Sequence, residues 1–199
     1  MTKLLAIAGS YRDGGTIDQA LAVAREAALK MGAEMEIIQL RDFPIAFCRN
    51  CRECTQSPGE SPGACVQDDG MRELIEKIEA ADSLILASPT NFYTVTALFK
   101  RFMERLVVYA YWPWGMPAPK FRKLRPAKKA LVIASAAAPS FMGRLSYTTS
   151  KQLKLTAKTV GAKTVGDVFI GLAAGEPHPE LRQRERVKIE RAVHRLIGT

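Results

Sequence analysis

The chain has 199 residues, 47% of them hydrophobic, and its 29 Lys and Arg against 20 Asp and Glu give a formal net charge of +9. This length allows one well-buried core, so we expect a single domain over residues 1–199. No apolar run approaches the roughly 20 residues that a membrane-spanning helix needs, which argues against a membrane protein. The first residues lead straight into a strand without a signal-peptide region, so the sequence predicts a cytoplasmic protein.

The basic excess is concentrated in residues 120–129 and 182–195, and neither segment carries an interleaved aromatic platform. Proteins that bind single-stranded nucleic acid combine such cations with stacking aromatic side chains. We therefore interpret both segments as solvated faces that attract phosphorylated small molecules, and we expect no nucleic-acid partner.

Apolar, strand-like runs alternate along the chain with segments of helical periodicity. The strands are expected at residues 4–8, 35–40, 83–87, 130–134 and 165–170, and the helices at 17–31, 71–81, 95–106, 151–160 and 181–197. This βαβ series predicts an α/β fold with an open parallel sheet covered by helices on both faces. Ligands of such sheets bind at the carboxyl ends of the strands, so the loops after the first, third and fourth strands are the candidate site.

The first of these loops, GSYRDGGT at residues 9–16, connects a strand to a helix. Its backbone N–H groups, with Ser10 and Thr16, are placed to face one anion at a helix N-terminus, and Arg12 adds a positive charge. The spacing fits neither the dinucleotide fingerprint nor the nucleoside-triphosphate loop. A cofactor monophosphate is the functional interpretation, and an ordinary turn capped by Ser10 or Thr16 is the alternative.

The second loop, SPTNFYT at residues 88–94, suits a flat heteroaromatic ring. Pro89 stiffens it, Asn91 offers an amide donor and acceptor, and Phe92 and Tyr93 offer ring faces. The third loop, at residues 135–144, begins with Ser135 and three alanines, which let the backbone approach a ligand closely. Each of these two loops, taken alone, is also consistent with a simple connection.

These loops, with the segment LFKRFMER at residues 98–105, resemble the NAD(P)H-dependent FMN reductase family. The resemblance implies a flavodoxin-like, five-stranded parallel sheet of order 2-1-3-4-5 and an FMN cofactor. It implies that Ser10, Arg12 and Thr16 hold the FMN phosphate, that the loop from Pro89 to Tyr93 packs against the isoalloxazine edge, and that the loop from Ser135 to Ala138 lies along its other side. The implied cofactor-binding residues are Ser10, Arg12, Gly15, Thr16, Pro89, Thr90, Asn91, Phe92, Tyr93, Ser135 and Ala136. One departure is Gly15, where many relatives carry Asn.

All four cysteines lie in one loop, at residues 44–70, with the spacing C-x2-C-x2-C-x10-C. Within the same family, this segment is similar to the iron–sulfur flavoprotein branch, although the branch's motif has a shorter final gap. The candidate ligands are Cys48, Cys51, Cys54 and Cys65. A [4Fe–4S] cluster, a tetrahedral zinc site, and unligated thiols or an incidental disulfide all remain open. Asp68 and Asp69, which precede the helix at 71–81, are interpreted as its N-terminal cap.

Hydride transfer to a flavin needs no obligatory protein acid or base, so we expect no catalytic residue, and we assign His178 and His194 to the surface or to packing. The expected activity is oxidation of NAD(P)H with reduction of a small acceptor such as a flavin, a quinone or a metal ion. The rival function is that of a non-enzymatic electron carrier in which FMN, alone or with an iron–sulfur cluster, relays electrons between protein partners. Trp112 and Trp114 lie in a Pro-rich loop that we expect to cover the flavin of a neighbouring subunit or to anchor an interface, as in a homo-dimer or homo-tetramer.

Overall fold

The sheet at the centre of the molecule explains where the three loops lie. The computed structural model describes residues 1–176 and 179–198. Five parallel strands follow the order β2-β1-β3-β7-β8, and the short β4 adds an antiparallel pairing at the end of β3. Their bounds are β1 Lys3–Ala8, β2 Glu34–Gln39, β3 Ser83–Asn91, β4 Thr94–Val95, β7 Lys128–Ser135 and β8 Ala162–Ile170. The α/β fold and the predicted strand order are therefore confirmed.

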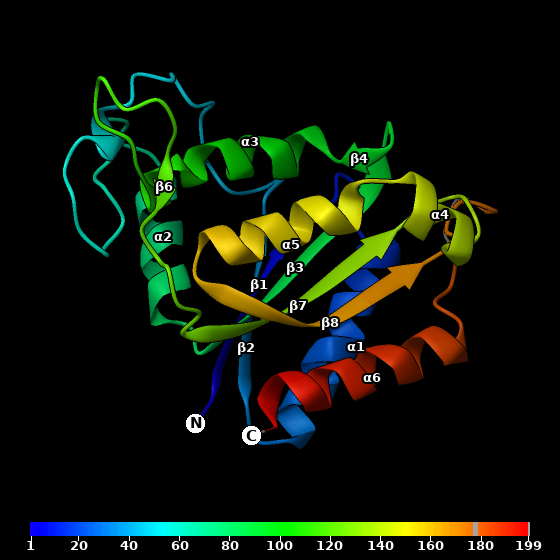
Figure 1. Cartoon of the computed structure of the whole chain (residues 1–199). Helices are drawn as coiled ribbons and strands as arrows, with labels where there is room; N and C mark the ends of the chain where they lie inside the picture. Colours follow the sequence, from blue (N-terminus) through cyan, green and yellow to red (C-terminus); the bar gives the residue numbers. More distant parts are fainter. Residues whose placement is uncertain (177–178, 199) are drawn as a thin grey trace.

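Helices cover both faces of the sheet (Figure 1). On one face lie α1 Thr16–Lys30 and α6 Gln183–Ile197, and on the other lie α2 Met71–Ala80, α3 Ala97–Arg105 and α5 Thr149–Thr159. Successive side chains of a strand point to opposite faces, so each central strand supplies both layers. In β1, Leu5 and Ile7 belong to the core beneath α3, whereas Leu4 and Ala6 belong to the core beneath α1.

The structure adds short elements that the periodicity does not indicate. They are η1 Glu53–Thr55, η2 Leu106–Tyr109, β5 Ala110–Tyr111, β6 Lys120–Phe121 and α4 Ser140–Ser146. The segment 135–144 was expected to be entirely loop, and α4 corrects this. The helix is too short to show a repeating apolar face, and it is held by a contact from another element, since Arg144 donates to the carbonyl of Asp167 at 3.0 Å.

Because all five long strands are parallel, their carboxyl ends meet at one edge of the sheet, toward which the arrowheads point in Figure 1. The loops after β1, β3 and β7 leave this edge together. Over the described residues, no helix combines the length and apolar character needed to cross a bilayer.

Candidate functional site

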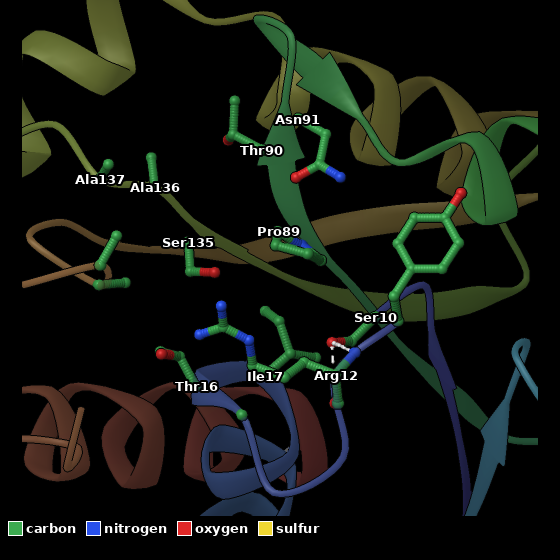
Figure 2. Close-up of a pocket in the computed structure, with 14 residues that line it drawn as sticks. Ser10, Arg12, Thr16, Ile17, Pro89, Thr90, Asn91, Ser135, Ala136 and Ala137 are labelled. Carbon is green, nitrogen blue, oxygen red and sulfur yellow. Dashed lines mark hydrogen bonds between the residues drawn. The ribbon is translucent and has the colours of Figure 1, made fainter. Parts of the chain in front are cut away.

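A pocket of about 330 Å³ opens at this edge and is lined by all three predicted loops. All of the expected cofactor-binding residues except Phe92 and Tyr93 line it. The lining consists of Ser10, Tyr11, Arg12, Gly15, Thr16, Ile17, Pro89, Thr90, Asn91, Ser135, Ala136, Ala137, Ala173 and Ala174. Segments more than 120 residues apart in the sequence therefore build one concave surface (Figure 2).

The first loop leads into a helix N-terminus that has no side-chain cap. The residue before α1 is Gly15, and no side chain accepts a hydrogen bond from the N-terminal N–H groups in the N-cap position. Ser10 does not cap the helix: its hydroxyl accepts from the Arg12 N–H and donates to the Arg12 carbonyl, both at 3.2 Å. Figure 2 shows the Arg12 guanidinium extending into the pocket between Thr16 and Ser135. The ordinary capped turn is thus not what the structure contains.

Two residues outside the loop fix its shape. Arg41, just after β2, donates to the Arg12 carbonyl at 3.2 Å and pairs with Asp13 at 2.9 Å and Asp18 at 3.3 Å. Thr96 donates from its hydroxyl to the Gly9 carbonyl at 2.6 Å. Gly9 itself must lack a side chain, because a Cβ there would lie 2.7 Å from the Cβ of Phe99. The sequence gives no signal for Arg41 or Thr96, since both act across the sheet.

The second loop divides at Asn91. Pro89, Thr90 and Asn91 continue β3 and line the pocket, whereas Phe92 and Tyr93 turn away in the left-handed region, with φ of 50° and 69°. Phe92 is 99% exposed and borders a neighbouring hollow of about 390 Å³, which shares Tyr11 and Asn91 with the pocket. Tyr93 packs edge-on against Tyr147, with ring centroids 5.2 Å apart. The turn into β4 is the reason that the two rings lie outside the pocket.

The third loop, after β7, forms the opposite wall of the pocket, and a fourth loop, after β8, lies against it. Ala136 forms backbone hydrogen bonds with the end of β8 and the segment after it: its N–H donates to the Ile170 carbonyl at 2.9 Å, and its carbonyl accepts from the Ala173 N–H at 3.0 Å. Ala173 and Ala174 consequently line the pocket, although the sequence did not single them out. Their place in the chain could have indicated them, because they follow the fifth parallel strand, which ends at the same edge of the sheet.

The four cysteines line a second, separate cavity of about 20 Å³. No residue lines both this cavity and the pocket at the sheet edge. All four thiols are free, so the incidental disulfide is not formed. Burial, followed by the neighbouring thiols of Cys65, Cys48 and Cys51, raises the pKa of Cys54 to about 11.

Four thiols around one cavity match a [4Fe–4S] cluster in kind and number of ligands. Within the described part of the chain, no three His, Cys, Asp or Glu side chains are arranged to hold a metal ion. A cluster gives each thiolate to a different iron, and its ligands therefore stand further apart than those of one ion. The cavity of about 20 Å³ has room for about one water molecule.

A buried ion pair joins the cysteine loop to α3. Arg105, the last residue of α3, is 1% exposed and pairs with Asp69 at 2.6 Å. It also donates to the Ala46 carbonyl at 2.9 Å and to the Cys65 Sγ at 3.5 Å. Asp69 accepts from the Met71 N–H at 3.0 Å, but the N-cap residue of α2 is Gly70 and no side chain caps the helix from that position, so the expected capping by Asp68 or Asp69 is not what the structure contains. The pairing of Asp69 with Arg105 was not expected. Asp68 is exposed and pairs only with Arg72 in the described structure.

The tryptophan loop packs on its own chain. The Arg52 guanidinium lies between the two indole rings, 3.7 Å from the Trp112 centroid and 4.3 Å from the Trp114 centroid. It also donates to the Trp112 carbonyl at 2.6 Å. The two indole rings therefore contact the cysteine loop of their own chain through Arg52. Of the two histidines, His194 is exposed on α6, as expected, and His178 lies outside the described residues.

These features define the class of protein: a flavodoxin-like α/β fold with a ligand pocket at the carboxyl edge of its parallel sheet. The family model described as NADPH-dependent FMN reductase matches residues 2–175. The chain belongs to this family.

Comparison with curated and solved proteins agrees with this assignment. An iron–sulfur flavoprotein of Archaeoglobus fulgidus is 37% identical over 103 residues, which are 52% of this chain and 48% of that protein. One of Methanosarcina thermophila is 31% identical over 106 residues, 53% of each chain. The chain thus spans about half the length of the curated relatives it matches. The NAD(P)H:quinone oxidoreductase of Methanothermobacter marburgensis has a similar fold, with a TM-score of 0.70 and 20% identity, over 100% of this chain and 97% of that one.

Proposed function

We propose that this protein is an FMN-dependent oxidoreductase that takes hydride from NAD(P)H and reduces a small acceptor such as a flavin, a quinone or a metal ion. The observation that carries the proposal is the convergence of three predicted loops on one pocket with a cation and an uncapped helix N-terminus. Membership of the FMN reductase family supports the cofactor. The expected homo-dimer or homo-tetramer stays a prediction.

The proposed residue roles follow from the lining. The N-terminal N–H groups of α1, Thr16 and Arg12 bind the phosphate, because they combine donors with positive charge at one end of the pocket. Pro89 and Asn91 on one side and Ser135 and Ala136 on the other flank the ring system with apolar surface and few polar groups.

The adjoining hollow at Phe92 is the proposed place of the second substrate. It shares Tyr11 and Asn91 with the pocket, so a molecule there would lie against the same wall. Lys100 also borders this hollow and supplies a positive charge for a phosphorylated nucleotide. When bound, FMN supplies the hydride-accepting chemistry, and the protein contributes binding, orientation and exclusion of water.

The decisive experiment is anaerobic stopped flow on the purified flavin-loaded protein. We expect stoichiometric FMN, and bleaching of its visible absorption by NADPH or NADH. Dithionite is the control, because it reduces a flavin without any nucleotide site. If dithionite reduces the flavin while millimolar nucleotide leaves it oxidised, the protein belongs instead to the electron carriers.

We further propose a [4Fe–4S] cluster on the four cysteines, supported by the shared cavity and by the names of the curated relatives. The same anaerobic sample is assayed for iron and labile sulfide. Iron and sulfide in equal amounts, with a broad brownish shoulder beside the flavin bands, are the expected result. Bound zinc without iron, or four titratable thiols without metal, would contradict the cluster and leave the flavin assignment standing.

A further inference from the structure

The gap between Cys54 and Cys65 is the part of the cysteine loop least suited to a fixed site. Ten residues separate these two cysteines, including two Pro-Gly pairs, and much of the gap is exposed. Left free, such a loop samples many separations between its ends, and closing it costs conformational entropy. Both cysteines nevertheless line the same cavity.

Arg122 provides one of the constraints. It follows β6, is 6% exposed, and donates only to backbone carbonyls. Among the described residues it forms no ion pair with a carboxylate. Its acceptors are Cys54 at 3.2 Å, Ser57 at 2.9 Å, Gly59 at 3.0 Å, Val108 at 3.0 Å and Ala110 at 3.2 Å. Three of these carbonyls belong to Cys54 and the gap that follows it, and two belong to the segment spanning η2 and β5. One buried cation therefore ties the gap to the body of the protein.

Gly63 provides the other constraint. Its N–H donates to the Val108 carbonyl at 2.8 Å, and a Cβ at this position would lie 1.8 Å from the Cys54 carbonyl oxygen. The backbone two residues before Cys65 is thus in direct contact with the backbone of Cys54. Only glycine permits this approach, and the obstacle to any larger residue is main chain rather than a movable side chain.

We propose that Arg122 and Gly63 are positioning residues that close the Cys54 to Cys65 gap and bring the two thiols to one cavity. The positioning role itself does not depend on the proposed cluster. Only its consequence does, namely that closing the ten-residue gap allows Cys54 and Cys65 to bind the same cluster. Arginine suits the task because its planar guanidinium carries five donors in a fixed arrangement, which a lysine ammonium cannot reproduce.

The first test needs no metal. Metal-free protein is reacted with a thiol reagent, and the rate at Cys54 is followed by peptide mass spectrometry. Cys54 is 7% exposed, so we expect it to react slowest in the wild type. Arg122→Met should raise its rate by at least about tenfold, because local opening of the loop exposes the thiol. Arg125→Met removes an exposed arginine three residues away and should leave the rate unchanged.

Gly63→Ala is the second variant and acts by steric conflict rather than by loss of hydrogen bonds. It should raise the labelling rate of Cys54 in the same way. Arg122→Lys retains the charge with fewer donors, so it should give an intermediate rate. FMN content is measured in every variant and should not change, because no residue of the gap lines the flavin pocket.

The second test is anaerobic reconstitution with ferrous iron and sulfide. Arg122→Met and Gly63→Ala should hold less than about half of the wild-type iron and lose the brown shoulder, with partial rescue in Arg122→Lys. Wild-type labelling rates at Cys54 in both variants would overturn the proposal. The proposal would also be overturned if a variant lost both its FMN and the slow labelling of Cys54, since Arg122 would then support the whole fold. A wild type that takes up no iron refutes the cluster, while the labelling comparison still decides the role of Arg122 and Gly63.

Discussion

Arg12 shows how one side chain adds charge to a site that the backbone prepares. Its N–H and carbonyl both bind the Ser10 hydroxyl, so its main chain is fixed, while its guanidinium extends into the pocket (Figure 2). Arg41 supports the same turn from β2 by donating to the Arg12 carbonyl. The position of the charge therefore depends on residues from the loops that follow two different strands.

Replacing Arg12 by alanine should weaken FMN binding by about 1.5–3 kcal/mol, which is the range for losing a hydrogen bond to a charged group. This corresponds to roughly a ten- to 150-fold higher Kd. Fluorescence titration of the metal-free apoprotein with FMN measures it. Arg25→Ala, on the exposed face of α1, is the matched control and should bind normally. Wild-type affinity in Arg12→Ala would show that the phosphate lies elsewhere.

At the scale of the element, α3 connects the two candidate sites. It begins after Thr96, whose hydroxyl bonds to Gly9 in the first pocket loop, and it ends at Arg105, which bonds to Cys65. A nine-residue helix is about 14 Å long. The helix thus holds the pocket at the sheet edge and the cysteine cavity at a fixed separation, with Phe99 and Phe102 packed into the core between them.

The N-cap of α3 should accordingly matter for stability. Thr96 is fully buried, and its hydroxyl accepts from the Phe99 N–H at 3.2 Å besides donating to Gly9. Thr96→Val keeps the shape of the side chain but leaves two buried backbone groups unpaired, so we expect a loss of roughly 1–3 kcal/mol in the free energy of unfolding. Urea unfolding followed by circular dichroism measures this loss.

Thr159→Val at the end of α5 is the control for Thr96→Val, since its hydroxyl bonds only to the carbonyl of Leu155 at the surface. It should change the free energy of unfolding by less than about 0.5 kcal/mol. Equal unfolding midpoints for Thr96→Val and the wild type would contradict the role given to the cap.

At the scale of the whole molecule, the Asp69 and Arg105 pair couples the cysteine loop to the core. Burial alone would raise the pKa of Asp69, but hydrogen bonds from Arg105 and from the N–H groups of Ala46 and Met71 outweigh it and lower the pKa below its usual value. A carboxyl with a lowered pKa in the folded state contributes stability that is fully present above its unfolded-state pKa of about 3.9. That contribution is lost as pH falls through the lower folded-state pKa.

Asp69→Asn should therefore destabilise the protein by about 3–5 kcal/mol at pH 7, because it leaves the buried Arg105 charge without its partner. The variant should also lose less stability than the wild type between pH 4 and 2. Urea unfolding at a series of pH values measures both effects. Asp68→Asn, at the exposed neighbouring carboxylate, should follow the wild type. If the free energy of unfolding had the same pH dependence in Asp69→Asn and in the wild type, Asp69 would not be the source of the stability lost at low pH.

The parallel sheet and the first three pocket loops were predictable from local signals, whereas the order of the strands was implied by the family resemblance. Alternating apolar runs indicate buried parallel strands, and parallel strands bring their following loops to one edge. Phe92 and Tyr93 show the limit of this reasoning. Their position beside Asn91 suggested ring contacts, yet a left-handed turn at both residues carries them out of the pocket. Backbone conformation at a tight turn depends on the strand pairing around it.

The sequence by itself determined the fold class, the edge at which the pocket opens, and the clustering of all four cysteines in one loop. These follow from periodicity and spacing along the chain. Only the tertiary structure decided that Arg41 and Thr96 fix the first pocket loop, that Arg52, Arg105 and Arg122 hold the cysteine loop, and that the two candidate sites stand at opposite ends of α3. Arg122 lies in the segment 120–129, which the sequence pattern indicated to be a solvated face, and its burial corrects that interpretation at this position. The partners of Arg52, Arg105 and Arg122 are mainly backbone carbonyls, with two indole rings and the Asp69 carboxylate, and they come from distant segments. Such partners leave no pattern in the sequence, because any residue type supplies a carbonyl.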